Sequence, residues 1–166
     1  MTSTQPAVSP ATLREVCGRW VTGVAVVTGT DHGGQPLGMA VNSFTSLSLE
    51  PPLVLFCPAS TSSTWPLIQQ SSRFAVNILA EPQSHLVRSF ARSGGDKFAG
   101  VPLRPAPDGL PALAGAVARI VCRIEDVHAG GDHQIVVGRV LATELFEGDP
   151  LVFHRGRTAG VALPVG

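Results

Sequence analysis

Apolar and polar residues alternate with a period of two over much of this chain, which is the pattern of a half-buried β-strand. The clearest case is residues 116–127, where the alternation predicts a strand with two unlike faces. One face is predicted to carry Ala116, Ala118, Ile120, Cys122 and Ile124, and the other face Arg119 and Arg123. The two arginines are therefore assigned to the polar face.

Six more segments have the apolar content and flanking turn residues of strands. They are residues 23–29, 37–46, 52–57, 74–79, 133–145 and 150–155. The first two are separated by residues 30–36, where an Asp, two Gly and a Pro predict a hairpin turn. The prolines before the third, Pro51 and Pro52, lie at its start, where a missing backbone donor is tolerated.

Three segments have the spacing of short helices instead. In residues 10–20 the apolar positions are Leu13, Val16, Cys17 and Trp20. A second helix is predicted to begin with Thr64 as its cap and Pro66 in its first turn. A third begins near Pro82, and its apolar stripe is predicted to be Leu86, Val87, Phe90 and Ala91.

The rest of the chain is irregular, most of all residues 101–115, a Pro- and Gly-rich segment that fits neither a helix nor a strand. We expect it to wrap over the surface or over a partner subunit. Six or seven strands with two or three short helices, and no alternating βαβ order, predict a mostly β fold, an antiparallel barrel with helical excursions. Residues 1–12 are predicted to be a disordered tail and residues 13–160 a single domain.

The composition narrows the possible partners. The 166 residues are 44% hydrophobic and 14% charged, and 12 basic and 12 acidic residues give a formal charge of zero at pH 7. Nucleic acids and anionic membrane surfaces need a basic excess on one face, so neither is an expected partner. Low charge in a small domain also favours self-association, and we expect a homodimer.

No segment approaches the run of about 18 apolar residues that a membrane-spanning helix needs. The first 12 residues lack the basic start and apolar centre of a signal peptide, so we expect a cytoplasmic protein. The cysteines, Cys17, Cys57 and Cys122, lie far apart among apolar neighbours and are expected to be buried thiols in a reducing compartment.

Several common sites are missing from the sequence. It has no GxGxxG after a strand, no GxxxxGK[ST] and no GxSxG, which are the motifs of dinucleotide-binding Rossmann units, P-loops and hydrolase elbows. His128 and His133 are five residues apart, which predicts opposite faces of a strand, and no metal site is expected.

Hydroxyl and amide side chains concentrate in two stretches. The first contains Asn42, Ser43, Thr45, Ser46 and Ser48, more hydrogen-bonding capacity than one neighbouring strand can use. A flat, polar ligand would use this capacity, whereas a solvent-facing strand edge or a turn would also explain it.

The second stretch is residues 60–64, Ser60, Thr61, Ser62, Ser63 and Thr64, which leads into the second predicted helix. Hydroxyls and free N–H groups at a helix N-terminus stabilise an anion such as phosphate, although one of these residues is also needed simply as a cap. Lys97, the only lysine, is either a counter-charge for such a phosphate or a solvated loop residue. His133 follows two glycines at the start of a predicted strand, where an exposed hairpin histidine is the alternative.

Taken in their order along the chain, the predicted strands, helices and polar stretches resemble the flavin reductase-like family. The fold of this family is an FMN-binding antiparallel split β-barrel, and its members are the reductase components of two-component flavin monooxygenases. The similarity runs over residues 20–156. The matching segments are residues 22–28, 38–56, 62–68, 74–79, 90–98, 113–122, 131–140 and 150–156.

The resemblance implies roles for particular residues. Those implied to line the flavin ring and ribityl chain are Asn42, Ser43, Thr45 and Ser46. Those implied to hold the phosphate and ribityl chain are Ser60, Ser62 and Thr64. Lys97 and Phe98 match a pair that closes over the cofactor, and His133 matches a histidine that contacts the incoming nicotinamide.

The implied reaction is hydride transfer from NADH or NADPH to N5 of bound FMN or FAD, with reduced flavin released to a separate monooxygenase. The chain departs from the family after residues 154–156, where many members carry an aromatic residue and this one has Thr158. Arg155 remains a possible source of charge there. Two rivals stay open: an FMN-binding electron carrier or sensor without fast nicotinamide oxidation, and a barrel that binds haem or a protein partner.

Overall fold

The computed structural model describes residues 7–161, and its largest element is a seven-stranded antiparallel sheet. Along the sheet the strand order is β3-β2-β6-β9-β10-β5-β4. The bounds are β2 Ala25–Thr30, β3 Pro36–Val41, β4 Thr45–Leu49, β5 Pro52–Phe56, β6 Arg73–Ile78, β9 Ala118–Gly130 and β10 His133–Leu145.

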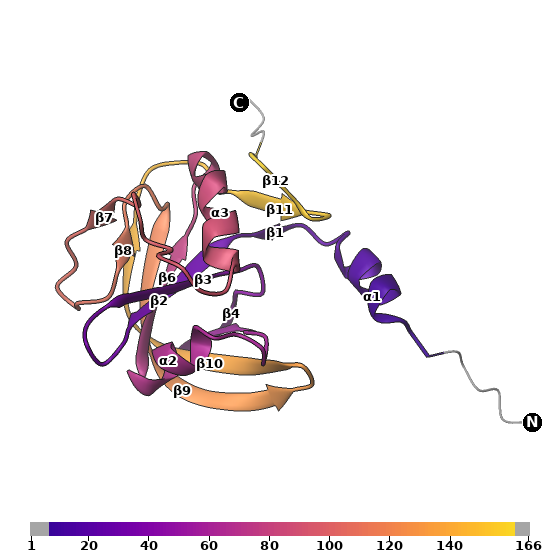
Figure 1. Ribbon diagram of the computed structural model, residues 1–166, viewed down its shortest axis with the longest axis horizontal. Coiled ribbons are helices and arrows are strands. Elements are labelled where there is room, and N and C mark those ends of the chain that lie inside the picture. Colours follow the sequence, from indigo (N-terminus) through magenta and orange to yellow (C-terminus); the bar gives the residue numbers. More distant parts are fainter. Residues whose placement is uncertain (1–6, 162–166) are drawn as a thin grey trace, which may run out of the picture.

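The sheet curls around one core, because strands near its opposite ends contribute to the same cluster of buried side chains. Met39 from β3 packs in the cluster that holds Val54 and Phe56 from β5. The edge strands β3 and β4 do not pair with each other, so the barrel is split at this point (Figure 1). The predicted mostly β, antiparallel split barrel is confirmed.

The hairpins follow from local chemistry. Asp31 ends the β2 strand region, and its Oδ1 accepts hydrogen bonds from the N–H groups of Gly33 at 2.8 Å and Gln35 at 2.9 Å. This side chain fixes the turn that the sequence predicted. The β9–β10 hairpin is much longer, and its pairing runs from Ala118–Leu145 to Gly130–His133 with two register shifts.

Short helices connect the strands. They are α1 Pro10–Cys17, α2 Trp65–Gln70, the 3-10 turn η1 Glu81–Gln83, and α3 Ser84–Ala91. The α3 helix buries Leu86 and Phe90 in a second core cluster, as its apolar stripe predicted, while Ala91 is exposed.

The α1 helix has no buried residue and stands clear of the barrel (Figure 1). It begins at Pro10, so residues 10–12 belong to a helix and not to the tail predicted for residues 1–12; residues 1–6 lie outside the described part. Its C-terminal end is tied to the barrel by a hydrogen bond from the Arg155 N–H to the Gly18 carbonyl, at 3.1 Å.

Two small sheets complete the fold. One has the order β1-β11-β12, from Thr22–Gly23, Val152–His154 and Arg157–Ala159. The other pairs β7, Leu103–Arg104, with β8, Ala112–Leu113. The prediction that residues 101–115 are wholly irregular is therefore wrong, because this segment pairs with itself.

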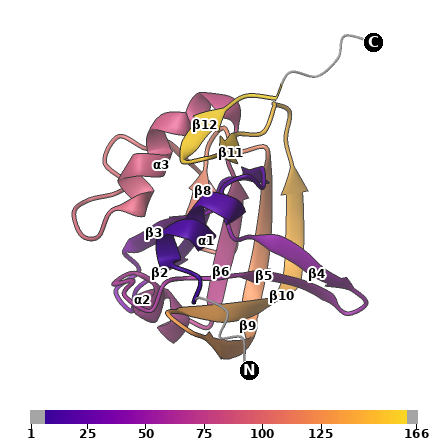
Figure 2. The same ribbon diagram turned by 90° about the vertical axis from the view of Figure 1, so that its right-hand side faces the viewer.

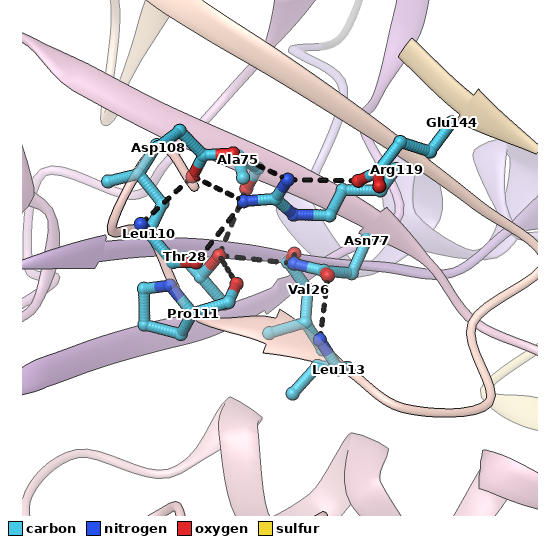
Figure 3. A network of polar contacts seen from close by, with 10 residues as sticks. All are labelled: Val26, Thr28, Ala75, Asn77, Asp108, Leu110, Pro111, Leu113, Arg119 and Glu144. Carbon is cyan, nitrogen blue, oxygen red and sulfur yellow. Dashed lines mark hydrogen bonds and ion pairs between the residues drawn. The ribbon is translucent and has the colours of Figure 1, made fainter. Parts of the chain in front are cut away.

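The second half of this Pro-rich segment packs on the chain's own barrel. Leu110, Ala112 and Leu113 are buried, and the Leu113 N–H donates to the buried Asn77 side chain at 3.0 Å. Thr28, also buried, donates its hydroxyl to the Pro111 carbonyl at 2.7 Å. These contacts join the segment to strands β2 and β6 (Figure 3).

Arg119 anchors the same segment, and its predicted place on the polar face of β9 is wrong. Its side chain is 1% exposed, and its guanidinium donates to both Asp108 oxygens, at 2.7 and 2.8 Å, and to Glu144 at 3.0 Å (Figure 3). Burial lowers the Arg119 pKa, but the hydrogen bonds that its guanidinium donates to Asp108 and Glu144 raise it by more, and the net effect is a raised pKa. The Arg119 hydrogen bond in turn lowers the pKa of Asp108.

The three cysteines are not all buried, contrary to the prediction from sequence. Cys122 is buried, and desolvation raises its pKa to about 12, whereas Cys57 is half-buried and Cys17 is exposed. The expectation of three buried thiols is wrong for Cys17.

His128 and His133 lie on two paired strands of a hairpin and not on opposite faces of one strand. Within residues 7–161, no helix has the length and apolar character to cross a membrane.

Candidate functional site

A polar cavity of about 470 Å³ opens where four segments meet. Its walls come from the end of β3 and the turn after it, the loop between β5 and α2, the end of α3 with the residues that follow, and the start of β10. Volumes of roughly 300–1,000 Å³ are typical of small-molecule sites. We call this the polar cavity.

The turn after β3 is fixed by Ser43. Its hydroxyl accepts from the Cys57 N–H at 2.9 Å and donates to the Cys57 carbonyl at 3.3 Å. One side chain thereby joins the turn to the end of β5, and both residues line the polar cavity. Asn42, the preceding residue, lies exposed at the edge of the same cavity.

The loop between β5 and α2 is held from both ends. Its Ser60 N–H donates to the Asp132 carbonyl at 2.8 Å, beside the start of β10. At the other end, Ser62 Oγ accepts from the Trp65 N–H at 3.1 Å and so caps α2. Thr64 occupies the N-cap position without a capping hydrogen bond, so the capping role predicted for its side chain is wrong.

Lys97 supplies a positive charge to the cavity wall. Its Nζ donates to the Thr64 hydroxyl and to the Gly38 carbonyl, both at 3.1 Å. Both acceptors are neutral, and none of the described residues that line the polar cavity is a carboxylate. Desolvation lowers the Lys97 pKa, which is the response of a cation without a compensating anion.

His133 begins β10 and also lines the polar cavity. Its Nδ1 lies 2.7 Å from Oδ1 of Asp132, and its ring is 46% exposed. This hydrogen bond, with the His133 charge, lowers the pKa of the Asp132 carboxyl. An ionised carboxylate can only accept, so Nδ1 of His133 carries the proton of this hydrogen bond.

The structure brings six of the ten predicted site residues to the polar cavity. They are Asn42, Ser43, Ser62, Thr64, Lys97 and His133. The remaining four lie elsewhere, for identifiable reasons.

Thr45 pairs with Leu55 across the β4–β5 ladder, and neither Thr45 nor its neighbour Ser46 lines the cavity; the Thr45 hydroxyl donates to the Ser46 carbonyl at 3.3 Å. Ser60 is exposed beyond the cavity wall. Phe98 packs edge-on against Phe90, with ring centroids 5.0 Å apart. It lines a neighbouring cavity of about 520 Å³, which Lys97 shares.

Two lining residues, Thr61 and Ser63, belong to the second hydroxyl stretch, although the resemblance gave neither of them a role. Sequence reasoning did not single out Arg92, which follows α3. Arg92 had one available signal, since it lies in the same short Gly-rich segment as Lys97. Met39 and Cys57 carried no such signal, because an apolar residue within or next to a predicted strand has the same local pattern as a core residue.

Comparison with known proteins is decisive at this point. The family model described as flavin reductase like domain matches residues 17–162. The chain belongs to the flavin reductase-like family. Among curated proteins, it is 46% identical over 156 residues to the reductase subunit HsaB of a flavin-dependent monooxygenase from Rhodococcus jostii, covering 93% of this chain and 80% of the relative.

Solved structures of this family have the same fold. A homologue of nitrilotriacetate monooxygenase component B from Mycobacterium thermoresistibile is 44% identical, with a TM-score of 0.87 over 92% of this chain and 86% of that one. The NADH:FAD oxidoreductase SgcE6 of Streptomyces globisporus, in complex with NAD and FAD fragments, is 35% identical, with a TM-score of 0.89 over 98% of this chain and 100% of that one.

The polar cavity of this flavin reductase-like chain fits a phosphorylated flavin. A flavin mononucleotide presents a flat ring with polar edges, a hydroxylated chain and a phosphate dianion. The cavity offers matching groups: hydroxyls from Thr61 and Ser63, a backbone-rich turn, and two cations, Lys97 and Arg92. The residues present are those expected of a site for this cofactor.

Proposed function

We propose that this protein is an NADH-dependent flavin reductase that binds FMN, or the FMN portion of FAD, in the polar cavity and delivers reduced flavin to a separate monooxygenase. NADPH is the alternative reductant. The observation that carries the proposal is the uncompensated charge of Lys97 beside Thr64, in a cavity that His133 also lines.

The phosphate end of the ligand is assigned to the wall formed by Lys97, Thr64 and Ser63. Lys97 already donates to Thr64, so its position is set before a ligand arrives. A phosphate placed there would gain a charge-assisted contact, and lysine serves this purpose as a compact point charge. Ser62 acts indirectly, because its hydroxyl is used to cap α2.

The ring end is assigned to the turn after β3 and to His133. Ser43 holds this turn in place through Cys57 and is not itself free to bind. His133, oriented by Asp132, stands half exposed at the cavity wall, where it can position the carboxamide of an incoming nicotinamide. When bound, the flavin supplies the hydride-accepting chemistry, so no general acid or base of the protein is required.

We assign the homodimer to the outer side of the sheet near its β4 edge. Strands β4 and β10 lie on either side of β5, and each carries two exposed leucines. They are Leu47 and Leu49 on β4, and Leu141 and Leu145 on β10. Apolar surface gathered on neighbouring strands favours an interface. With no net charge to select an oppositely charged partner, a second copy of the chain is the occupant we propose.

The direct test is to purify the protein and follow oxidation of NADH and NADPH at 340 nm with FMN, FAD and riboflavin added in turn. We expect fast NADH oxidation that depends on added or bound flavin. A protein that binds flavin tightly but oxidises neither nicotinamide would instead be an electron carrier or sensor. A protein that binds no flavin would contradict the proposal altogether.

A further inference from the structure

The loop between β5 and α2 is held along the start of β10, and we call its residues 58–64 the strap. At its first residue, the Gln134 N–H donates to the Pro58 carbonyl at 3.0 Å. One residue further along, Ala59 and His133 form an isolated antiparallel bridge. The beginning of the strap is therefore paired with the residue that we assign to the nicotinamide.

A side chain of β10 holds the other end of the strap. Trp65, the first residue of α2, is 2% exposed, and its Nε1–H donates to Oε1 of Gln134 at 2.7 Å. The Trp65 ring also packs edge-on against Phe56 of β5, with ring centroids 5.3 Å apart. Figure 1 and Figure 2 both show α2 next to the β9–β10 hairpin. Gln134 thus contacts both ends of the strap, through its backbone at one end and its side chain at the other.

The strap carries part of the wall that we assign to the phosphate. Ser63 and Thr64 line the polar cavity, and the Thr64 hydroxyl accepts from Lys97 Nζ at 3.1 Å. The two ends of the proposed ligand site are thereby attached to one short segment, the phosphate wall to its end and His133 to its beginning. A shift of the strap relative to β10 would change the distance between these two ends.

Trp65 and Gln134 do not touch the polar cavity themselves, since neither is among the described residues that line it. Successive side chains of a strand point to opposite faces, so Gln134 points away from the cavity that His133 lines. Any effect of this hydrogen-bonded pair on a ligand must therefore pass through the strap.

We propose that Trp65 and Gln134 are a positioning pair, which fixes the strap against β10 and so sets the distance between the phosphate wall and His133. The inference rests on the proposed reductase function for the identity of the ligands, FMN and a reduced nicotinamide. The attachment of the strap can be measured without either of them. Removal of the pair should weaken both ends of the site together, although neither residue contacts a ligand.

The hydrogen bond between these two side chains also satisfies a buried donor. A buried indole N–H without an acceptor lowers stability, so the loss of the Gln134 amide should destabilise the fold whatever it does to ligand binding. A stability measurement by itself does not separate the two roles. The strap and the ligands must therefore be measured alongside the stability.

The first experiment measures amide hydrogen exchange in the flavin-free protein. Gln134→Met keeps nearly the length of the side chain but removes the acceptor. In this variant the amides of Ser60 and residue 134, which both bond across the strap, should exchange about tenfold faster relative to the amides of β2. Gln70→Met, at an exposed position of α2, is the matched control and should exchange as the wild type does. Equal acceleration in the strap and in β2 would mean a global loss of stability and would overturn the proposal.

The second experiment titrates FMN and riboflavin and follows steady-state oxidation of NADH. Gln134→Met should weaken FMN about three- to tenfold, the loss of one hydrogen bond, and riboflavin less than about twofold, because only FMN reaches the phosphate wall. It should also lower kcat/KM for NADH about three- to tenfold, mainly through a higher KM, because His133 is displaced and the chemistry is not. Gln70→Met should change none of these quantities.

The double variant Trp65→Phe with Gln134→Met separates positioning from stability. With the indole absent, Gln134→Met leaves no buried donor without a partner, so it should lower the midpoint of urea denaturation less than it does in the wild type. The losses in FMN affinity and in kcat/KM for NADH should be the same in both single variants and in the double variant, because each lacks the same hydrogen bond. If these ligand properties recovered together with stability, the pair would have a structural role only.

The outcomes distinguish this inference from the proposed function. An active Gln134→Met enzyme with the FMN preference and the kcat/KM of the wild type rejects the positioning pair alone. A wild-type protein that oxidises neither nicotinamide rejects the proposed function alone, because the exchange measurement still decides whether the pair holds the strap.

Discussion

His133 and Asp132 form a pair in which each residue sets the chemical state of the other. The carboxylate holds a proton on Nδ1 and so fixes the orientation of the ring, while Nε2 makes no hydrogen bond to another described residue. Such a residue orients a substrate and need not transfer a proton. The role is therefore one of positioning, which makes a specific kinetic prediction.

We predict that His133→Ala lowers kcat/KM for NADH about tenfold, the loss of one good hydrogen bond. The dissociation constant of flavin should change less than twofold, because the described hydrogen bond of the His133 side chain is to Asp132 and not to Lys97, Thr64 or Ser63. Steady-state oxidation of NADH and a flavin titration measure the two quantities. His128→Ala, which alters an exposed histidine on the paired strand, is the control. Complete loss of turnover with flavin still bound would contradict a positioning role.

Lys97 is the only lysine of the chain, and it faces a cavity wall that has no carboxylate among its described residues. We predict that Lys97→Met weakens FMN at least tenfold and riboflavin less than twofold, because only FMN has a phosphate for the charge to hold. Fluorescence titration of both flavins measures the difference. Arg88→Met removes an exposed charge from α3 outside the cavity and should affect neither ligand. Equal weakening of FMN and riboflavin would reject the phosphate assignment.

At the scale of elements, the Pro-rich segment around β8 is held by polar contacts more than by its own regularity. Arg119 on β9 reaches Asp108 and the Leu110 carbonyl, while Thr28 and Asn77 bind the segment further along (Figure 3). A buried guanidinium needs all of its partners, because an uncompensated charge in the interior is costly. Removal of one partner should therefore loosen the whole segment.

We predict that Asp108→Asn lowers the free energy of unfolding by about 3 kcal/mol at pH 7, the usual cost of breaking a buried ion pair. Urea denaturation measures it. Asp126→Asn, which alters a carboxylate that is 61% exposed, should cost less than about 0.5 kcal/mol. If Asp108→Asn unfolded at the same urea concentration as the wild type, the ion pair would not be what holds this segment.

The same carboxyl predicts a pH dependence. The Asp108 pKa is lower in the folded protein than its ordinary value of 3.8, so the carboxylate form stabilises the fold. This stabilisation is complete above about pH 5 and is lost as the pH falls below 3.8 through the folded pKa. The stability difference between wild type and Asp108→Asn should therefore shrink between pH 5 and about pH 3. A difference that stayed constant over this range would contradict the assignment to Asp108.

At the scale of the whole molecule, the sequence contained most of the strands but few of the buried polar contacts. The limits of β10 follow from a sharp apolar pattern between Gly131 and Phe146, and they were predicted to the residue. Arg119 looked like a surface residue because alternation places it opposite Ile120. Its partners, Asp108 and Glu144, are 11 and 25 residues away along the chain, and the local sequence pattern around Arg119 does not predict these ion pairs.

In the candidate site too, residues with a local signal were predicted, and those whose position depends on long-range pairing were not. Lys97, Thr64 and His133 stood out because residue type and local context both marked them. Thr45 was misplaced because a hydroxyl on an edge strand and a hydroxyl in a cavity have the same local pattern, and only the pairing of β4 with β5 decides between them.

The proposed homodimer is a property of the complete surface, and its location can be tested. The sequence left open whether the Pro-rich segment wraps over the surface or over a partner subunit, and the second half of that segment packs on its own barrel. The exposed leucines of β4 and β10 are the better candidate, because an interface needs apolar surface that the monomer does not bury.

We predict that the wild-type protein sediments at twice the 17.3 kDa chain mass at micromolar concentration. Leu141→Asp places a charge on a β10 side chain that is 50% exposed, so it should give a monomer without unfolding the barrel. Leu103→Asp alters a leucine of similar exposure, 44%, on the Pro-rich segment, and this variant should remain a dimer. If Leu103→Asp dissociated the protein and Leu141→Asp did not, the segment and not the sheet would form the contact. A wild-type monomer throughout the micromolar range would exclude both surfaces, and the apolar side chains of β4 and β10 would then be free to meet the monooxygenase partner.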